Sequence, residues 1–116
     1  MSRFTMDNEK YHFVMGADRT TSAFFQIWEQ PHEEQDMPLI GVDNQGVHIY
    51  GDIPDGLKRK IKELIDRFEI SKQKGNLYPN IDLETINDIA RRLGFPLSKR
   101  NNMVAYYDDF DYDYKE

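Results

Sequence analysis

The sequence predicts an α+β fold, in which an antiparallel sheet of three or four strands is followed by two or three helices packed on one face. Aromatic and β-preferring runs separated by turn residues fill residues 10–50. Apolar residues then recur at intervals of three and four in residues 54–73 and again in residues 83–93. We expect a single domain at residues 1–105, followed by a disordered, acidic and aromatic tail at residues 106–116.

Two hairpins account for the predicted sheet. The first joins strands at residues 10–16 and 23–28 through polar turn residues. Residues 30–37 are polar and acidic and include a proline, which has no amide hydrogen to donate to a sheet, so a solvated loop is expected there. A second hairpin covers residues 39–50 and turns at Gly46, because glycine adopts a positive φ without steric cost.

The strand at residues 23–28 has large apolar side chains on both of its faces. A period of two places Phe25 and Ile27 on one face, and Phe24 and Trp28 on the other. One face is expected to pack under the long helix. The other, with Phe24 and Trp28, needs cover from the C-terminal segment, the second helix or another chain, so burial within the monomer, a homodimer and a protein-binding face all remain open.

Two amphipathic helices follow the predicted sheet. The apolar stripe of the first consists of Leu57, Ile61, Leu64, Ile65 and Phe68. Its other face is basic, with Lys58, Arg59, Lys60, Lys62, Arg67, Lys72 and Lys74. The second helix has Asp82 as its expected cap and Gly94 just beyond its end. Residues 97–107 show a weaker pattern that fits either a short third helix or an extended arm.

The net charge of −6 is distributed unevenly along the chain. Residues 1–56 carry 3 basic and 10 acidic side chains, residues 57–102 carry 11 and 6, and residues 103–116 carry 1 and 5. A basic helical segment therefore lies between an acidic sheet segment and an acidic tail. Such a segment can meet phosphates, a protein partner or the chain's own tail.

The chain has no Cys, which excludes disulfide scaffolds, Cys-ligated zinc and Cys nucleophiles. It also has no apolar run long enough to cross a bilayer, and its first ten residues lack the pattern of a signal peptide. We therefore expect a cytoplasmic protein without membrane contact.

Few residues suggest catalysis or metal binding. The three histidines, His12, His32 and His48, have no metal-ligand spacing, although His12 and His48 would meet if their strands were neighbours. The serines lie in no nucleophile elbow, and the glycines form no phosphate-binding loop. These observations predict a non-enzymatic protein without a metal or other cofactor.

Residues 86–103 resemble the helix-turn-helix motif of DNA-binding proteins. Ala90 matches the small residue of the first helix and Gly94 the glycine of the turn. Apolar matches are Ile89, Leu93, Phe95 and Met103. Arg100 departs from the motif, which usually has a buried aliphatic residue there. The resemblance implies a recognition helix that starts after Phe95 and presents Ser98, Lys99, Asn101 and Asn102 to phosphates or base edges. For a DNA-binding regulator we expect the contacts to come from Arg91, Arg92, Ser98, Lys99 and Arg100.

The tail favours a different class of partner. Acidic and aromatic residues alternate in residues 106–116, a composition suited to docking in a basic groove of another protein. The first functional hypothesis is accordingly a small module that binds and regulates or inhibits another protein, in the manner of an immunity protein, antitoxin or phage inhibitor. Its expected contact residues are Phe24, Trp28, Asp109, Phe110, Asp111 and Tyr112. The alternative is a helix-turn-helix regulator that uses the basic segment at residues 57–102.

Residues 13–28 also resemble small uncharacterised bacterial proteins that combine a Gly-x-Asp turn with a Phe-Phe strand. This resemblance implies a bacterial or phage origin and no particular activity.

Overall fold

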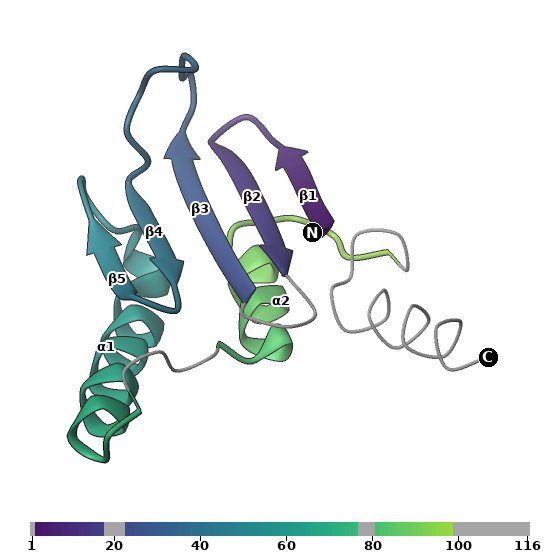
Figure 1. Ribbon diagram of the computed structural model, residues 1–116. Helices are drawn as coiled ribbons and strands as arrows, with labels where there is room; N and C mark the ends of the chain where they lie inside the picture. The colour runs from purple at the N-terminus through teal and green to yellow at the C-terminus, as the bar shows by residue number, and fades with distance from the viewer. Residues whose placement is uncertain (1, 18–22, 77–80, 99–116) are drawn as a thin grey trace.

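The computed structural model describes residues 2–17, 23–76 and 81–98, and it has an α+β architecture (Figure 1). The five strands are β1 (Ser2–Asp7), β2 (Tyr11–Ala17), β3 (Ala23–Glu29), β4 (Ile40–Asp43) and β5 (Gly46–Ile49). A 3₁₀ turn, η1 (Asp55–Leu57), leads into the helices α1 (Lys58–Gln73) and α2 (Leu83–Arg92). The strands lie side by side in chain order, and each neighbouring pair is antiparallel.

The fifth strand corrects the predicted count of three or four. Strand β1 was missed because it contributes only two apolar side chains, Phe4 and Met6, to the core. They lie opposite Met15 and Phe13 of β2. The turn is held by Asn8, whose Oδ1 accepts backbone hydrogen bonds from Lys10, just before β2, at 2.9 Å and from Tyr11, the first residue of β2, at 2.7 Å. Pairing with β2, rather than a strong pattern of its own, makes this segment a strand.

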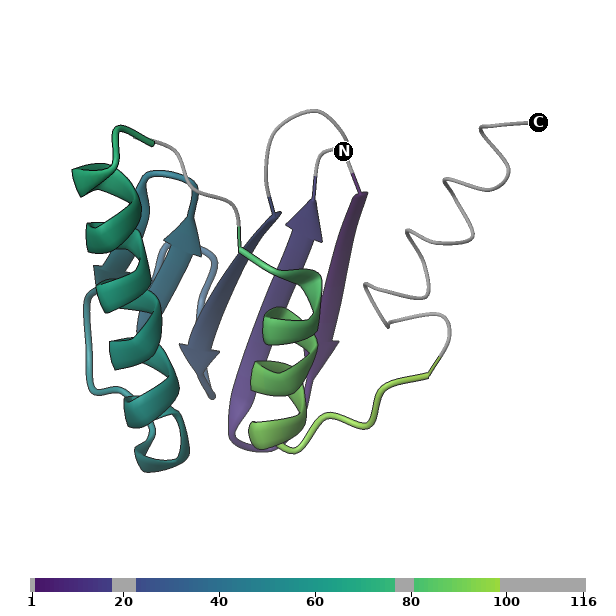
Figure 2. The same ribbon diagram turned by 90° about the horizontal axis from the view of Figure 1, so that it is seen from below.

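Both helices pack on the same face of the sheet (Figure 2). Helix α1 contacts β5 and helix α2 contacts β3. The predicted positive φ is present at Gly46, at 140°, and at Gly94, at 93°, where the chain leaves α2. Asp82 stands at the expected N-cap position, but it makes no capping hydrogen bond; its carboxylate instead lies 3.4 Å from Arg67 of α1.

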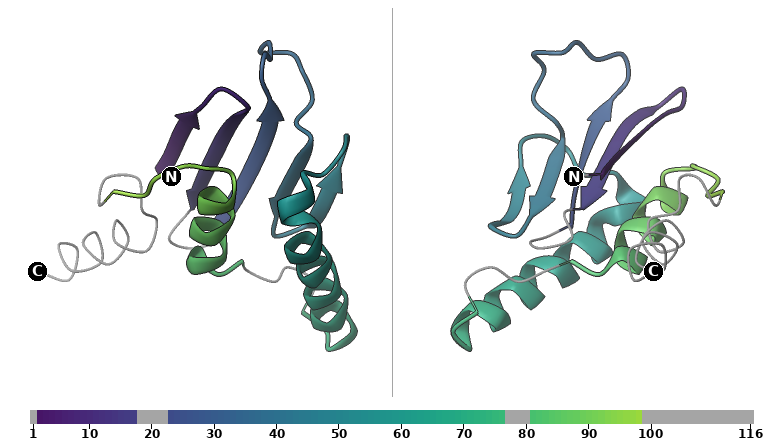
Figure 3. Two further views of the ribbon diagram at one scale, coloured as in Figure 1. Left: turned by 180° about the vertical axis from the view of Figure 1, so that it is seen from behind. Right: turned by 45° about the vertical axis from the view of Figure 1, so that its right-hand side comes forward.

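The hydrophobic core fills the layer between the sheet and the two helices (Figure 3). Fully buried side chains from the sheet include Phe13, Met15, Phe25, Ile27 and Ile40, and those from η1 and the helices include Leu57, Ile61, Leu64, Ile86 and Ile89. The predicted helical stripes therefore point inward as expected. Residues 99–116, which contain the predicted tail and most of the segment expected to form a third helix, lie outside the described residues.

Candidate functional site

The face of the sheet opposite the helices is the first candidate for a functional surface. No helix of the described residues covers it (Figure 3). One row of residues crosses all five strands on this face, because each is the register partner of the next. From β1 to β5 the row consists of Thr5, Val14, Gln26, Gly41 and His48. We call this side of the sheet the open face. It combines polar, aromatic and glycine positions, in contrast to the apolar helix side.

Phe24 and Trp28 both lie on the open face, as the alternation in the sequence predicts. Each side chain is partly exposed, whereas Phe25 and Ile27 on the other side of the same strand are 0% exposed. The Arg3 guanidinium carbon lies 5.8 Å from the centre of the Phe24 ring. Gly16 separates these two residues in the register and leaves room for the guanidinium to reach across.

Trp28 belongs to a cluster of three aromatic rings. The rings of His12 and His32 are stacked with their centres 4.2 Å apart, and the Trp28 ring lies 5.4 Å from His12 and 6.1 Å from His32. His12 comes from β2 and Trp28 from β3, where they are direct partners, and His32 comes from the loop after β3. The loop between β3 and β4 is thus folded back onto the sheet.

Hydrogen bonds fix this cluster in place. Asp7 Oδ1 lies 2.6 Å from His12 Nδ1 and accepts a 2.8 Å hydrogen bond from the Gln30 side-chain amide. The side-chain oxygen of Gln30, Oε1, lies 2.8 Å from His32 Nδ1. The Trp28 indole N–H donates a 2.8 Å hydrogen bond to the backbone carbonyl of Asp36 in the same loop. The cluster connects β1, β2, β3 and the loop, so its rings form a preorganised surface.

Two hollows open on this face, separated by Gln26. We name each by one of its lining residues, Val14 and Gly41, which flank Gln26 in the register. The Val14 hollow, of about 250 Å³, is lined by Arg3, Thr5, His12, Val14, Gln26, Trp28, His32 and Glu34. The Gly41 hollow, of about 410 Å³, is lined by Arg3, Phe24, Phe25, Gln26, Pro38, Gly41, Val42, Asp43, His48 and Tyr50. Both are small enough to take single side chains of a partner.

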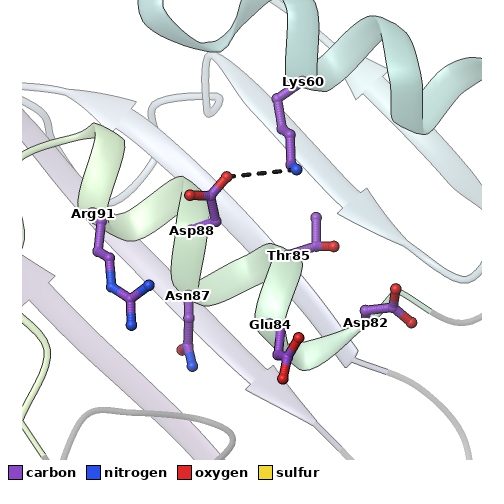
Figure 4. Close-up of a pocket in the computed structure, with 7 residues that line it drawn as sticks. All are labelled: Lys60, Asp82, Glu84, Thr85, Asn87, Asp88 and Arg91. Carbon is purple, nitrogen blue, oxygen red and sulfur yellow. Dashed lines mark ion pairs between the residues drawn. The ribbon is translucent and has the colours of Figure 1, made fainter.

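A third concavity lies between the helices, on the opposite side of the molecule (Figure 4). Its volume is about 500 Å³, and it is lined by Lys60, Asp82, Glu84, Thr85, Asn87, Asp88 and Arg91. Lys60 reaches from α1 towards Asp88 of α2, with Nζ 3.5 Å from the carboxylate, and Arg92 approaches the same carboxylate at 2.9 Å. The hydrogen bond from Arg92 lowers the pKa of Asp88. These charges neutralise one another, which suits a bridge between helices better than a ligand site.

The residues expected to contact DNA are placed only in part. Arg91 and Arg92 are exposed at the end of α2, and Ser98 is exposed after it, while Lys99 and Arg100 lie outside the described residues. Of the positions that carry the motif resemblance, Ile89, Ala90, Leu93 and Phe95 are buried. Gly94 has a positive φ, and Met103 lies outside the described residues. The described residues directly after Gly94, from Phe95 to Ser98, have no helical structure.

The tail residues expected to contact a protein partner, Asp109, Phe110, Asp111 and Tyr112, all lie outside the described residues. Phe24 and Trp28 are therefore the part of that expected site whose positions are known.

The open face also contains residues that the sequence did not single out together. His12 does not meet His48, because β3 and β4 separate their strands; it stacks on His32 instead. Asp7 and Asp43 each contact the histidine five residues later, at 2.6 and 3.3 Å. This repeated Asp-to-His spacing was a signal in the sequence, since it places both residues on one face of a hairpin.

Within the described part of the chain, no group of three or more His, Asp or Glu side chains is arranged to hold a metal ion. Neither of the described helices has the length and apolar character that spanning a membrane requires. Comparisons with protein-family models, curated proteins and solved structures find no match to this chain. The function must therefore be inferred from the surfaces themselves.

Proposed function

We propose that this chain is a small, non-enzymatic interaction module that binds another protein through the open face and thereby regulates or inhibits it. The observation that supports this proposal is the exposure of Phe24 and Trp28 on a sheet face that no described helix covers. Aromatic side chains dominate the energetic centres of protein interfaces, because they bury a large area with few rotatable bonds. The absence of Cys favours the cytoplasm as the place of this interaction.

The order of the aromatic cluster supports the same proposal. Partners bind more tightly to side chains that are already held in place, since less conformational entropy is lost on association. Trp28 is held by its hydrogen bond to the loop and by the two histidine rings. The tail residues Asp109, Phe110, Asp111 and Tyr112 would extend the contact with further acidic and aromatic groups.

The test is a comparison of the full chain with three variants as bait for proteins of the cell. We expect a specific partner to be captured by the wild type and lost on Trp28→Ala and on Phe24→Ala, each with at least about a tenfold loss of affinity in titrations with the purified partner. A matched control, Arg91→Ala, changes the helix side and should bind normally. Equal binding by all four proteins would exclude the open face.

A second variant set separates the tail from the sheet. Replacing Asp109, Phe110 and Asp111 together by Ala should weaken the interaction if the tail takes part, and leave it unchanged if the open face acts alone. Light scattering of the purified chain tests the homodimer: a dimer that dissociates on Trp28→Ala would identify a second copy as the occupant of the open face.

The alternative proposal is a DNA-binding regulator that uses Arg91, Arg92, Ser98, Lys99 and Arg100. It is supported by the buried motif positions and by the exposed arginines at the end of α2. Carboxylates close to those arginines weaken it: Asp88 is paired with Arg92, and Asp82 and Glu84 line the same groove as Arg91.

The alternative predicts binding to random duplex DNA at low salt, since phosphate contacts release counterions. It would be measured with the full chain and with a chain that lacks residues 105–116, which removes the acidic tail. Absence of binding by both proteins at low salt would eliminate the alternative.

A further inference from the structure

We propose that the open face recognises a basic segment of its protein partner, with one arginine or lysine side chain bound in the Gly41 hollow and another in the Val14 hollow. The inference rests on the proposed function and adds the chemistry of the partner to it.

The two hollows are similar in composition. The Gly41 hollow is lined by the aromatic side chains of Phe24 and Tyr50 and by the carboxylate residue Asp43. The Val14 hollow is lined by Trp28, by the two stacked histidines and by the carboxylate residue Glu34, and Gln26 lines both hollows. Each hollow therefore combines aromatic side chains with one carboxylate residue.

Aromatic faces beside a carboxylate are suited to a cationic side chain. The ring presents its negative quadrupole to the cation, and the carboxylate provides a charge-assisted hydrogen bond. A guanidinium fits best, because it is planar, weakly hydrated and able to stack on a ring while it donates to the carboxylate.

The chain already makes one such contact with a residue of its own. The Arg3 guanidinium lies 5.8 Å from the centre of the Phe24 ring, within the range of a cation–π interaction. Among the described residues that line the two hollows, Arg3 is the one Lys or Arg side chain, and it borders both. Arg3 would therefore compete with a cationic side chain of a partner.

The charge of the sheet segment also favours a positively charged partner. Residues 1–56, the part of the chain that contains the five strands, carry 3 basic and 10 acidic side chains. Asp43 keeps 44% of its side-chain surface exposed although it contacts His48, so it can still accept a hydrogen bond from outside. A basic segment would approach this surface favourably, and a polyanion would be repelled.

The spacing of the hollows sets the spacing of the two cations. Val14, Gln26 and Gly41 are direct neighbours on β2, β3 and β4, so Val14 and Gly41, which line the two hollows, lie two strand spacings apart, roughly 10 Å. In a polyproline II segment, residues three apart lie on the same side and are separated by about 9 Å. Two arginines with two residues between them would reach both hollows at once.

The test uses short synthetic peptides and the full chain. The peptide Pro-Arg-Pro-Pro-Arg-Pro is compared with versions in which one Arg is Gln, both are Lys, or both are Glu. The chain has a single Trp, Trp28, which lines the Val14 hollow, so its fluorescence reports binding directly. Amide and indole NMR shifts then locate the contact. We expect the two-arginine peptide to bind roughly two- to fivefold more tightly than the one-arginine peptide, and the Glu peptide not to bind.

Charge variants of the chain give effects of opposite sign. Arg3→Gln should strengthen binding of the two-arginine peptide by roughly two- to fivefold, because it frees the Phe24 ring and removes a like charge. Asp43→Asn and Glu34→Gln should weaken it by a similar factor. An asparagine at position 43 keeps a side-chain oxygen that can accept the turn hydrogen bond, which the Gln45 backbone N–H donates to Asp43 Oδ1 at 2.8 Å. The control is Glu69→Gln, which removes the same charge from the exposed surface of α1.

A further variant fills one hollow. A Cβ at Gly41 would meet the nearest side-chain atom, Gln26 Cγ, at 3.6 Å, an ordinary contact distance, so Gly41→Leu introduces a side chain into this hollow without a clash at its Cβ. It should reduce the affinity for the two-arginine peptide to that for the one-arginine peptide, while Trp28 fluorescence still responds. Its NMR spectrum checks that the fold is retained.

Several results would overturn the inference. Weaker binding by Arg3→Gln, or tighter binding of the Glu peptide, would identify an anion site instead. Equal binding by Asp43→Asn, Glu34→Gln and the wild type would exclude carboxylate recognition. The two proposals fail separately: capture of a partner that depends on Trp28 but is indifferent to Asp43 and Glu34 would retain the interaction module and reject the basic segment. Arginine-dependent peptide binding without any protein partner would retain the recognition of a basic segment and reject the interaction module.

Discussion

Phe24 and Phe25 are consecutive residues with the same side chain and opposite surroundings. Phe25 is 0% exposed and stacks on Phe13 with ring centres 5.9 Å apart, beneath the helices. Phe24 is partly exposed on the open face, with a guanidinium as its neighbour. Both residues have the same extended backbone in β3. The position of the helices makes Phe25 a core residue and leaves Phe24 as a candidate contact residue.

The same contrast extends across the sheet. On the helix side, Phe25 lies between Met15 and Val42 in the register, and all three are buried. One residue along, Gln26 lies between Val14 and Gly41 and separates the two hollows. A shift of the register by one residue would exchange these faces, so the pairing of the strands is itself required for the candidate site.

The largest expected effect comes from truncating each phenylalanine. Phe25→Ala should lower the free energy of unfolding by about 3–5 kcal/mol, because it opens a cavity in the core. Phe24→Ala should lower it by less than about 1 kcal/mol, since water can reach that side. Urea unfolding of both variants measures the difference, and equal losses would mean that the open face is buried in solution.

An intermediate effect is expected when small residues on the two sides are enlarged. Ala90 of α2 is 0% exposed, so Ala90→Leu should lower the free energy of unfolding by about 1–3 kcal/mol through overpacking. Gly41→Val on the open face should leave it unchanged or raise it by up to about 1 kcal/mol, because valine suits a strand and its Cβ would lie 4.0 Å from the nearest backbone atom. Thermal unfolding checks both variants, and destabilisation by Gly41→Val would contradict an uncovered face.

The smallest expected effect is in the polar groove between the helices. The hydrogen bond from Arg92 holds the pKa of Asp88 below its usual value; burial opposes this shift, and Lys60 adds to it. Asp88 therefore stabilises the fold above the carboxyl pKa of the unfolded chain, about 3.9, and the contribution is lost as the pH falls through the lower folded value. Since solvent screens the pair, Asp88→Asn should lower the free energy of unfolding by less than about 1 kcal/mol at pH 7.

The pH dependence identifies the source of that effect. The difference in free energy of unfolding between the wild type and Asp88→Asn should shrink as the pH falls from about 4 through the lower folded pKa, because the carboxylate is protonated first in the unfolded chain and then in the folded one. Urea titrations at pH 7 and at pH 3 measure it. A difference that stays constant between these pH values would assign the effect to packing.

The sequence predicted the helices well because each has a local signal. The apolar stripes at intervals of three and four led to residues 54–73 and 83–93, and the observed α1 and α2 are Lys58–Gln73 and Leu83–Arg92. Gly94 was expected to end the second helix, and it does so with a φ of 93°. Local spacing and backbone sterics sufficed for these elements.

The candidate site was predicted only in part. Alternation along β3 put Phe24 and Trp28 together on one face, and the structure agrees. The stacking of His32 on His12 was missed because it depends on how a 10-residue loop folds back, and Arg3 was missed along with its strand. These contacts join residues far apart in the chain, for which a single sequence has no periodic signal.

The sequence by itself determined the α+β class, the two helices and the two faces of β3, because helical stripes and strand alternation depend on residues at most four positions apart. The helices cover the side of Phe25, as expected, whereas the tertiary structure alone decided that β1 completes the sheet. It also decided that aromatic rings and carboxylates gather around Val14 and Gly41. The physical reason is that an amphipathic strand offers two faces, and only the burial of apolar surface by distant elements selects which one becomes the core.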